Sequence, residues 1–218
     1  KNVDIRSTAQ TGIGLILRAV SGETGGGNTL LENVSTYKFA KGWEIGHATA
    51  GSGSQTTTVA CLSCQASDAL TYGVLFGHGA VLGSWEHGYI ESTEDGASGG
   101  IGLWIKNSAS DISVRGSWFN NNDVGIQLGD GTDGTSYRFR NPDISGNTIG
   151  VTNIGIRVYS AATTSYGASI KNNRIDKVSG TATGIFIEDV VHYQLTIEDN
   201  ELGKLVALDT NISNPNSI

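Results

Sequence analysis

Apolar residues alternate with small or polar residues in a short tract that recurs along the chain. Alternation with a period of two is typical of a β-strand, because successive side chains point to opposite faces of a sheet. Each tract opens with a glycine, and successive glycines are 25 to 31 residues apart. The pattern therefore predicts one strand in each repeat of about 29 residues. The tracts begin at Gly12, Gly42, Gly73, Gly100, Gly125, Gly155 and Gly184.

A second tract precedes the first by 11 to 15 residues and has an apolar residue at each end. Its fourth position is mostly Asn or Ser, and the clearest copies are residues 114–119, 144–149, 170–175 and 197–202. Asparagine tolerates bend conformations, and stacked amides can hydrogen-bond from one repeat to the next. We therefore predict a structural ladder at one corner of the repeat. Its members are Asn33, Ser117, Asn147, Asn173 and Asn200.

Two strand tracts that stay in register over seven repeats predict an all-β fold, a single-stranded right-handed parallel β-helix of about eight coils. Propeller blades need about 40 residues or more, and the leucine-rich consensus is missing. A β-sandwich remains the structural alternative. The β-helix is expected over residues 1–210, and residues 211–218 are expected to form a loose tail or a link to a following domain.

The period of two also separates the inward side chains from the outward ones. Two columns of apolar residues are expected to stack inside the helix. Successive residues of a column come from adjacent coils, which lie about 4.8 Å apart. The first column is Ile101, Ile126, Ile156 and Ile185, and the second is Leu103, Leu128, Val158 and Ile187.

Outward side chains of the glycine-led tracts form the first candidate site. Aromatic rings pack against the C–H faces of sugars, and sugar hydroxyls need directional polar partners. Trp104 and Tyr159 are expected about 10 Å apart, with Gly129 leaving an open slot between them. A position under a loop or at a subunit contact is the alternative. The residues predicted to bind a polysaccharide are Trp104, Gln127, Arg157, Tyr159, Phe186 and Glu188.

A second candidate site lies on the other tract. Tyr89 and Trp118 occupy the same motif position in consecutive repeats, and so do Glu86 and Arg115. Such pairs can hold a sugar or simply stabilise a sheet. Glycoside hydrolysis needs two carboxyl groups, and no pair stands out, so catalysis is left open. The carboxylates considered are Glu91, Glu94, Asp95, Glu188 and Asp189.

Composition fits short strands joined by tight turns, with 31 glycines, 2 prolines and 16% charged residues. The net charge of −7 argues against nucleic acid, which demands a basic surface. No stretch is apolar enough for membrane insertion, and the histidines lack ligand spacing, so no metal and no cofactor are expected. Cys61 and Cys64 in an extended strand would have Cα atoms about 10 Å apart, too far for a disulfide.

The glycine-led strand and the Ile-x-Gly/Asn-Asn-x-Ile turn resemble those of the pectate-lyase-like β-helix superfamily. Within it, Gly-rich and Ser/Thr-rich coils with irregular loops are most similar to bacteriophage tailspikes and tail-fibre depolymerases. The resemblance spans about residues 1–208. It implies a homotrimer on a virion tail, or otherwise extracellular, that binds bacterial surface polysaccharide. Whether the chain also cleaves the glycan, as a glycosidase or lyase, is left open because no catalytic signature of pectate lyases or polygalacturonases is recognisable.

Two other functions remain open, since the fold hosts many activities. One is a non-catalytic structural or adhesive β-helix, and the other is a secreted polysaccharide lyase or epimerase. The expected trimer has one further motive, a set of aromatic residues expected at the surface of a weakly charged chain. These are Trp85, Trp104, Trp118, Tyr137, Tyr159 and Tyr166.

Overall fold

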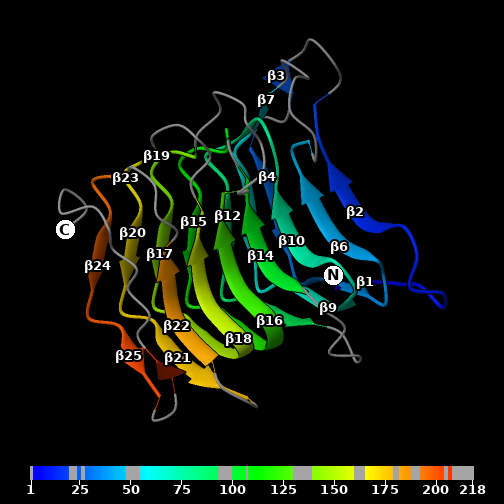
Figure 1. Cartoon of the computed structure of the whole chain (residues 1–218). Helices are drawn as coiled ribbons and strands as arrows, with labels where there is room; N and C mark the ends of the chain where they lie inside the picture. Colours follow the sequence, from blue (N-terminus) through cyan, green and yellow to red (C-terminus); the bar gives the residue numbers. More distant parts are fainter. Residues whose placement is uncertain are drawn as a thin grey trace.

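The computed structural model is a stack of coils in which every regular element of the described residues is a β-strand (Figure 1). All strand pairs between neighbouring coils are parallel, so the predicted all-β parallel β-helix is confirmed. No helix in this part of the chain is long and apolar enough to cross a membrane. The structure describes residues 2–19, 24–25, 28–47, 55–92, 100–106, 108–129, 139–159, 165–178, 182–187, 192–203 and 206–207.

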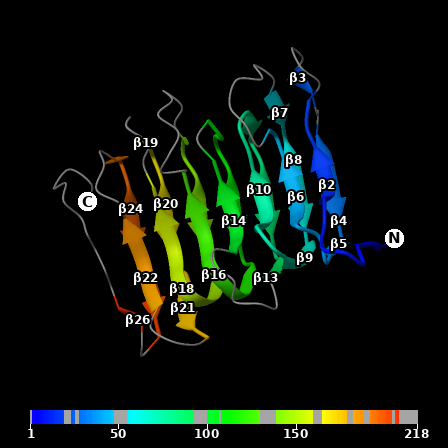
Figure 2. The ribbon, with the colours of Figure 1, turned by 45° about the vertical axis from the view of Figure 1, so that its right-hand side comes forward.

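Three columns of strands form three long faces of the stack, which Figure 2 shows from the side. The first face contains β1 (Val3–Arg6), β5 (Val34–Tyr37), β9 (Gln65–Ala69), β13 (Tyr89–Ser92), the first parts of β16 (Trp118–Leu128) and β18 (Thr148–Val158), β21 (Arg174–Lys177) and β25 (Glu201–Leu202). The second contains β2 (Ile13–Leu17), β6 (Lys41–Ile45), β10 (Tyr72–Phe76), β14 (Ile101–Ile105), the last parts of β16 and β18, β22 (Ala182–Ile187) and β26 (Val206–Ala207).

The third face is a separate seven-stranded sheet. It contains β4 (Thr29–Glu32), β8 (Val59–Leu62), β12 (Ser84–Glu86), β15 (Ser113–Arg115), β17 (Asp143–Ser145), β20 (Ser169–Lys171) and β24 (Thr196–Glu198). Short strands make two small sheets, one of β3 (Thr24–Gly25), β7 (Gln55–Thr57) and β11 (Ala80–Val81), the other of β19 (Ser165–Tyr166) and β23 (His192–Tyr193). Within the described residues no third-face strand precedes β1, and β25 and β26 have two residues each, so complete coils number fewer than the eight predicted.

Close stacking of the coils explains the repeated glycine of the second face. A Cβ atom added at any of these glycines would lie under 3.0 Å from the carbonyl oxygen of the glycine in the next coil. The sequence placed two members of this column too early, because Gly14 and Gly102 occupy it in place of Gly12 and Gly100. The glycines that meet this limit are Gly14, Gly42, Gly73, Gly102, Gly125 and Gly155.

The same displacement corrects the predicted inward columns. Leu103 pairs with Ile126 and Ile105 pairs with Leu128, whereas Ile101 pairs with Val124. A shift of two residues keeps every side chain on its expected side, because the period of a strand is two. From Ile126 onward the columns are as predicted, since Ile156 and Ile185 follow in register.

The asparagine ladder is confirmed over four coils. The Asn147 side-chain amide donates to Asn173 Oδ1 at 2.9 Å, and Asn173 donates in the same way to Asn200. The Ser117 amide N–H donates to Asn147 Oδ1 at 3.0 Å. Asn33 was wrongly included, because it lies one residue earlier, in a column of left-handed turn residues, with a φ of 53°. Buried amides satisfy one another here, so the corner tolerates polar side chains at its interior.

Cys61 and Cys64 are both free and buried, and Cys64 Sγ donates to the Leu31 and Leu62 carbonyls at 3.5 Å. Cys61 lies in β8 and Cys64 follows that strand, so the two do not share one extended strand and the wide separation predicted for such a strand does not apply. The physical reason is Ser63, whose φ of 52° bends the chain between β8 and β9. A left-handed residue at this corner brings the two neighbouring side chains toward one another.

Candidate functional site

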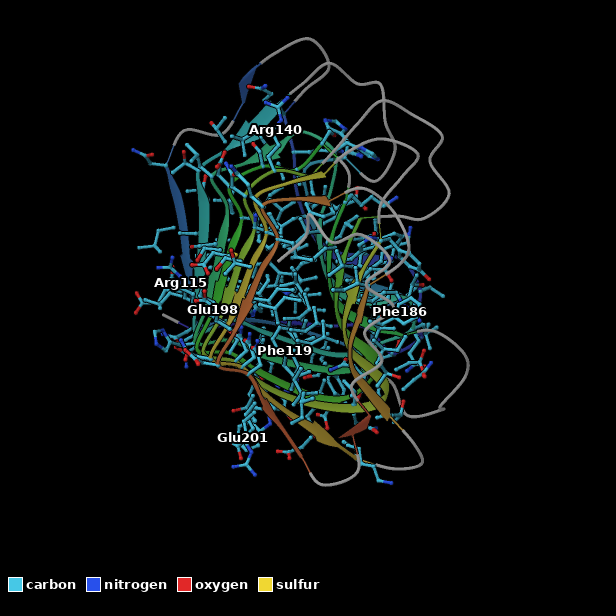
Figure 3. The ribbon with its side chains drawn as sticks, turned by 60° about the vertical axis from the view of Figure 1, so that its left-hand side comes forward. Arg115, Phe119, Arg140, Phe186, Glu198 and Glu201 are labelled. Carbon is cyan, nitrogen blue, oxygen red and sulfur yellow. The ribbon has the colours of Figure 1, made fainter. Side chains whose placement is uncertain are left out.

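The predicted site residues that the structure describes lie on the outer side of the second face, which we call the Trp104–Arg157 face. Trp104, Gln127, Arg157 and Phe186 are direct register partners in β14, β16, β18 and β22. Tyr159 follows β18, and Glu188 lies outside the described residues. Figure 3 shows Phe186 on the outer side of this face, while Phe119 points into the interior.

The polar side chains of the Trp104–Arg157 face bond to one another and to the backbone of the same face. The Trp104 indole N–H donates to the Gly129 carbonyl at 2.8 Å, and Gln127 donates to the same oxygen at 3.2 Å. Arg157 in turn donates to Gln127 Oε1 at 3.4 Å. Gln127 is only 4% exposed, and Gly129 is buried, so the open slot expected at Gly129 is wrong. Trp104 belongs to the column of Gln127 rather than to that of Gly129 and Tyr159.

Cations cover two of the aromatic rings of this face. Lys106 Nζ lies 4.5 Å from the centroid of the Trp104 ring, and the Arg157 guanidinium lies 5.1 Å from that of Tyr159. Tyr72 also packs edge-on against Trp104, with centroids 6.3 Å apart. Cation–π contacts of this kind occupy ring faces that would otherwise be open to a ligand.

The outside of the first face, which we call the Tyr89–Trp118 face, presents a different surface. Its outward residues stand in two columns set by the parallel register. One column is Asp4, Ser35, Gln65, Tyr89, Trp118, Thr148, Arg174 and Glu201. The other is Arg6, Tyr37, Ser67, Glu91 and Asn120, followed beyond a register shift by Gly150 and Asp176.

Trp118 is the most open aromatic residue among those described. It is 58% exposed, and its ring meets Tyr89 edge-on at a centroid distance of 6.2 Å. Trp85, by contrast, was expected at the surface and is fully buried against Trp43. The reason is register, because Trp85 pairs with Cys61 and Val114, which both point inward. Tyr137 and the side chain of Tyr166 lie outside the described residues.

Polar groups surround the Tyr89 and Trp118 rings. The Asn120 amide donates to Glu91 Oε1 at 3.3 Å and lies 3.5 Å from the Tyr89 hydroxyl. Burial, with added repulsion from the nearby carboxylates of Glu91 and Asp68, raises the pKa of Tyr89. The phenol therefore stays protonated at neutral pH and acts as a hydrogen-bond donor.

A hollow of about 270 Å³ lies on the same face, on the amino-terminal side of Tyr89. Arg6 borders it, held by Asp4 at 2.7 Å and lying over the Tyr37 ring at 5.7 Å. The hollow is lined by Asp4, Arg6, Ser35, Thr36, Tyr37, Gln65 and Ser67. Hydroxyl, amide and charged groups beside aromatic rings are the partners that sugar hydroxyls and sugar faces require.

The sequence identified only part of this surface. Tyr89 and Trp118 were noticed because they repeat at one motif position, but Gln65 at the same position was not. Asn120 directly follows the clear motif copy 114–119, and Tyr37 lies two residues beyond the weaker copy 30–35, so neither fell within the motif. Of the candidate carboxylates Glu91 is described, whereas Glu94, Asp95 and Asp189 lie outside the described residues. Within the described part of the chain, no group of three or more His, Cys, Asp or Glu is placed to hold a metal.

Residues 52–206, more than two thirds of the chain, match the family model described as the right-handed β-helix region. The chain belongs to the right-handed β-helix family. This membership agrees with the parallel coils and with the superfamily expected from the glycine-led strands. No curated protein and no solved structure matches the chain. As a right-handed β-helix, the chain has a fold consistent with polysaccharide binding or with a structural role.

Proposed function

We propose that this β-helix binds a bacterial surface polysaccharide along its Tyr89–Trp118 face. The observation that carries the proposal is Trp118, a 58% exposed ring that stands beside Tyr89 in register with it. An exposed indole on a soluble rod suits stacking against a sugar ring. The columns on either side supply amides, hydroxyls and carboxylates for sugar hydroxyls.

The shape of the face suits a chain rather than a single sugar. From β1 to β16 the face spans five strands, or about 19 Å at about 4.8 Å per step. The hollow beside Tyr37 and the Trp118 platform lie on this one line. A linear glycan lying along the axis would contact both.

The Trp104–Arg157 face, which the sequence predicted as the first candidate site, is here the second candidate surface. Its aromatic rings and its guanidinium are the right groups for a sugar chain. Support is weaker there because Gln127 is buried and the Trp104 and Tyr159 rings carry cation–π partners. A glycan would have to displace Lys106 or Arg157 before stacking on either ring.

Substitutions on the two faces separate these surfaces. Trp118→Ala should weaken binding to a responsive glycan about fivefold, since an aromatic contact contributes about 1 kcal/mol. Trp104→Ala is the matched control and should leave affinity unchanged. The measurement is calorimetry against a panel of bacterial surface polysaccharides, with thermal melts to check folding. A loss with Trp104→Ala alone would move the site to the second face.

A finer part of the proposal is that the chain is the body of a phage tailspike or tail fibre. Such a protein would sit on a virion tail, or otherwise outside the cell, as a homotrimer. The Gly-rich and Ser/Thr-rich coils and the exposed apolar residues Leu30 and Leu82 support this. Cleavage of the bound glycan would appear as new reducing ends, or as unsaturated uronates for a lyase. If no glycan in the panel binds the wild-type protein, the structural or adhesive role takes its place.

A further inference from the structure

Negative charge predominates on the Tyr89–Trp118 face. Its two outward columns carry four carboxylates, on Asp4, Glu91, Asp176 and Glu201, against two guanidiniums, on Arg6 and Arg174. One further cation, the Lys38 ammonium, lies 5.5 Å from the centroid of the Tyr37 ring, so the carboxylates still outnumber the cations. Like charges repel an approaching ligand over roughly 8 Å at physiological salt. A polysaccharide lying along this face therefore meets an excess of negative charge.

Both guanidiniums are already paired within their own strands. Arg6 Nε lies 2.7 Å from Asp4 Oδ2, and Arg174 Nε lies 2.8 Å from Asp176 Oδ2. Residues two apart in a strand point to the same side, which explains why each pair forms on the outer face. A sugar carboxylate would have to compete with these internal partners for either arginine.

Beside the Tyr89 and Trp118 rings lies the Glu91 carboxylate, whose hydrogen-bond partners are neutral. Glu91 accepts from the Asn120 amide at 3.3 Å and interacts with the Tyr89 hydroxyl. Among the described residues no lysine or arginine forms an ion pair with Glu91. Asp68 adds a second negative charge that acts on the same Tyr89 hydroxyl. Within the described part of the chain, the Glu91 charge near the Trp118 ring is therefore not neutralised by a cation.

We infer that the Tyr89–Trp118 face selects neutral and amine-bearing polysaccharides and rejects uronate-rich chains. The inference rests on the proposed function and adds the chemical class of its ligand. A protonated amino sugar stacked on Trp118 brings its charge close to Glu91, whereas a uronate brings a carboxylate to the same place. A neutral polysaccharide would keep the stacking on Trp118 but would lack the attraction between an amine and Glu91.

The test compares oligosaccharides that share a backbone and differ in charge. Each backbone is offered in a neutral, an amine-bearing and a uronate-bearing form, and affinities are measured by calorimetry at pH 6. The wild-type protein should bind the amine form about two- to fivefold more tightly than the neutral form, the range typical of an exposed ion pair. The uronate form should bind most weakly, and added salt should narrow the differences.

Glu91→Gln isolates the platform carboxylate. This substitution keeps an oxygen that can accept from Asn120 and should remove most of the preference for the amine form. Glu198→Gln is the matched control, because this carboxylate pairs with Lys171 on the third face (Figure 3). The control should leave the preference unchanged.

The outcomes separate the two ideas. A uronate form that binds wild type more tightly than its neutral form overturns the charge inference, while loss of binding in Trp118→Ala would still support the site. Binding that ignores Trp118→Ala, or no binding by any form, overturns the proposed function and the inference with it. An unchanged amine preference in Glu91→Gln also overturns the role assigned to Glu91.

Discussion

At the residue scale, the gap between coils leaves no room for a side chain at the repeated glycine of the second face. Gly42 shows this clearly, because an added Cβ would press on the backbone carbonyl of Gly73, which cannot move without its whole strand. Gly150 differs, since its nearest neighbour is the side chain of Val178 at 3.3 Å. Both glycines sit in strands, so propensity alone would treat them alike.

We expect Gly42→Ala to lower the free energy of unfolding by about 2 kcal/mol or more, the effect of forcing atoms into a packed interior. Gly150→Ala should change it by less than about 1 kcal/mol, because the half-exposed Val178 side chain has room to shift. Urea unfolding followed by circular dichroism measures both. Equal midpoints for the two variants would contradict the stacking explanation.

The cysteine pair gives a second residue-scale prediction. The hydrogen bond from Cys61, and then nearby backbone groups, lower the pKa of Cys64 from 9.0 to about 7. A folded-state pKa below the unfolded one stabilises the protein above the unfolded pKa, and this stabilisation is lost as pH falls through about 7. The pKa of Cys61 is raised instead, by the same hydrogen bond and by burial.

We therefore expect the stability difference between wild type and Cys64→Ser to grow in favour of wild type from pH 6 to pH 8.5, by about 1 kcal/mol. Urea unfolding under reducing conditions at several pH values gives this difference. Cys61→Ala is the matched control, because alanine has no donor to replace the one that lowers the Cys64 pKa, so it should flatten the pH dependence. A pH-independent difference for Cys64→Ser would show that the thiol stays neutral.

At the element scale, the sequence predicted strand facing well and register less well. Facing follows from the period of two, which survives a displacement of two residues. Register depends on the connection between faces, and that connection differs from coil to coil. In β16 the strand turns the corner without a loop, at Asn121 with a φ of 54° and at buried Asn122, which donates to the Ile90 carbonyl. Residues 93–99 intervene at the same corner one coil earlier, so the glycine spacing alone could not align the copies.

The two unbroken strands should also be the part of the molecule that is best protected from amide hydrogen exchange. β16 and β18 each have 11 residues and pair with neighbours on both sides along two faces. Strands β1 and β2 pair on one side in the described structure, and Val3 and Ile16 are 48% and 41% exposed. Hydrogen exchange by mass spectrometry should show the slowest amides in β16 and β18 and faster exchange in β1 and β2. Uniform exchange along the rod would contradict this gradient.

At the scale of the whole molecule, the repeat itself allowed the fold to be predicted, while function depends on side chains that the repeat does not constrain. Most inward positions are apolar or belong to the asparagine ladder, so they recur and can be recognised. Outward positions face water and are free to vary, as Gln65, Tyr89 and Trp118 do at one position. Such a surface can be recognised only once the strand register shows which outward residues are neighbours.

Assembly gives the last prediction, since the proposed trimer would use a surface other than the face proposed to bind glycan. Leu30 and Leu82 are 64% and 58% exposed and lie at the third face and at the turn leading into it. Apolar groups at such exposure favour a subunit contact. We expect light scattering to give three times the chain mass for wild type, and Leu30→Asp with Leu82→Asp to reduce it to one chain mass. Trp118→Ala should leave the mass unchanged and weaken glycan binding. The double leucine variant should bind glycan with the wild-type affinity per chain. A monomeric wild type would remove the trimer without touching the glycan surface, since each chain carries a whole Tyr89–Trp118 face.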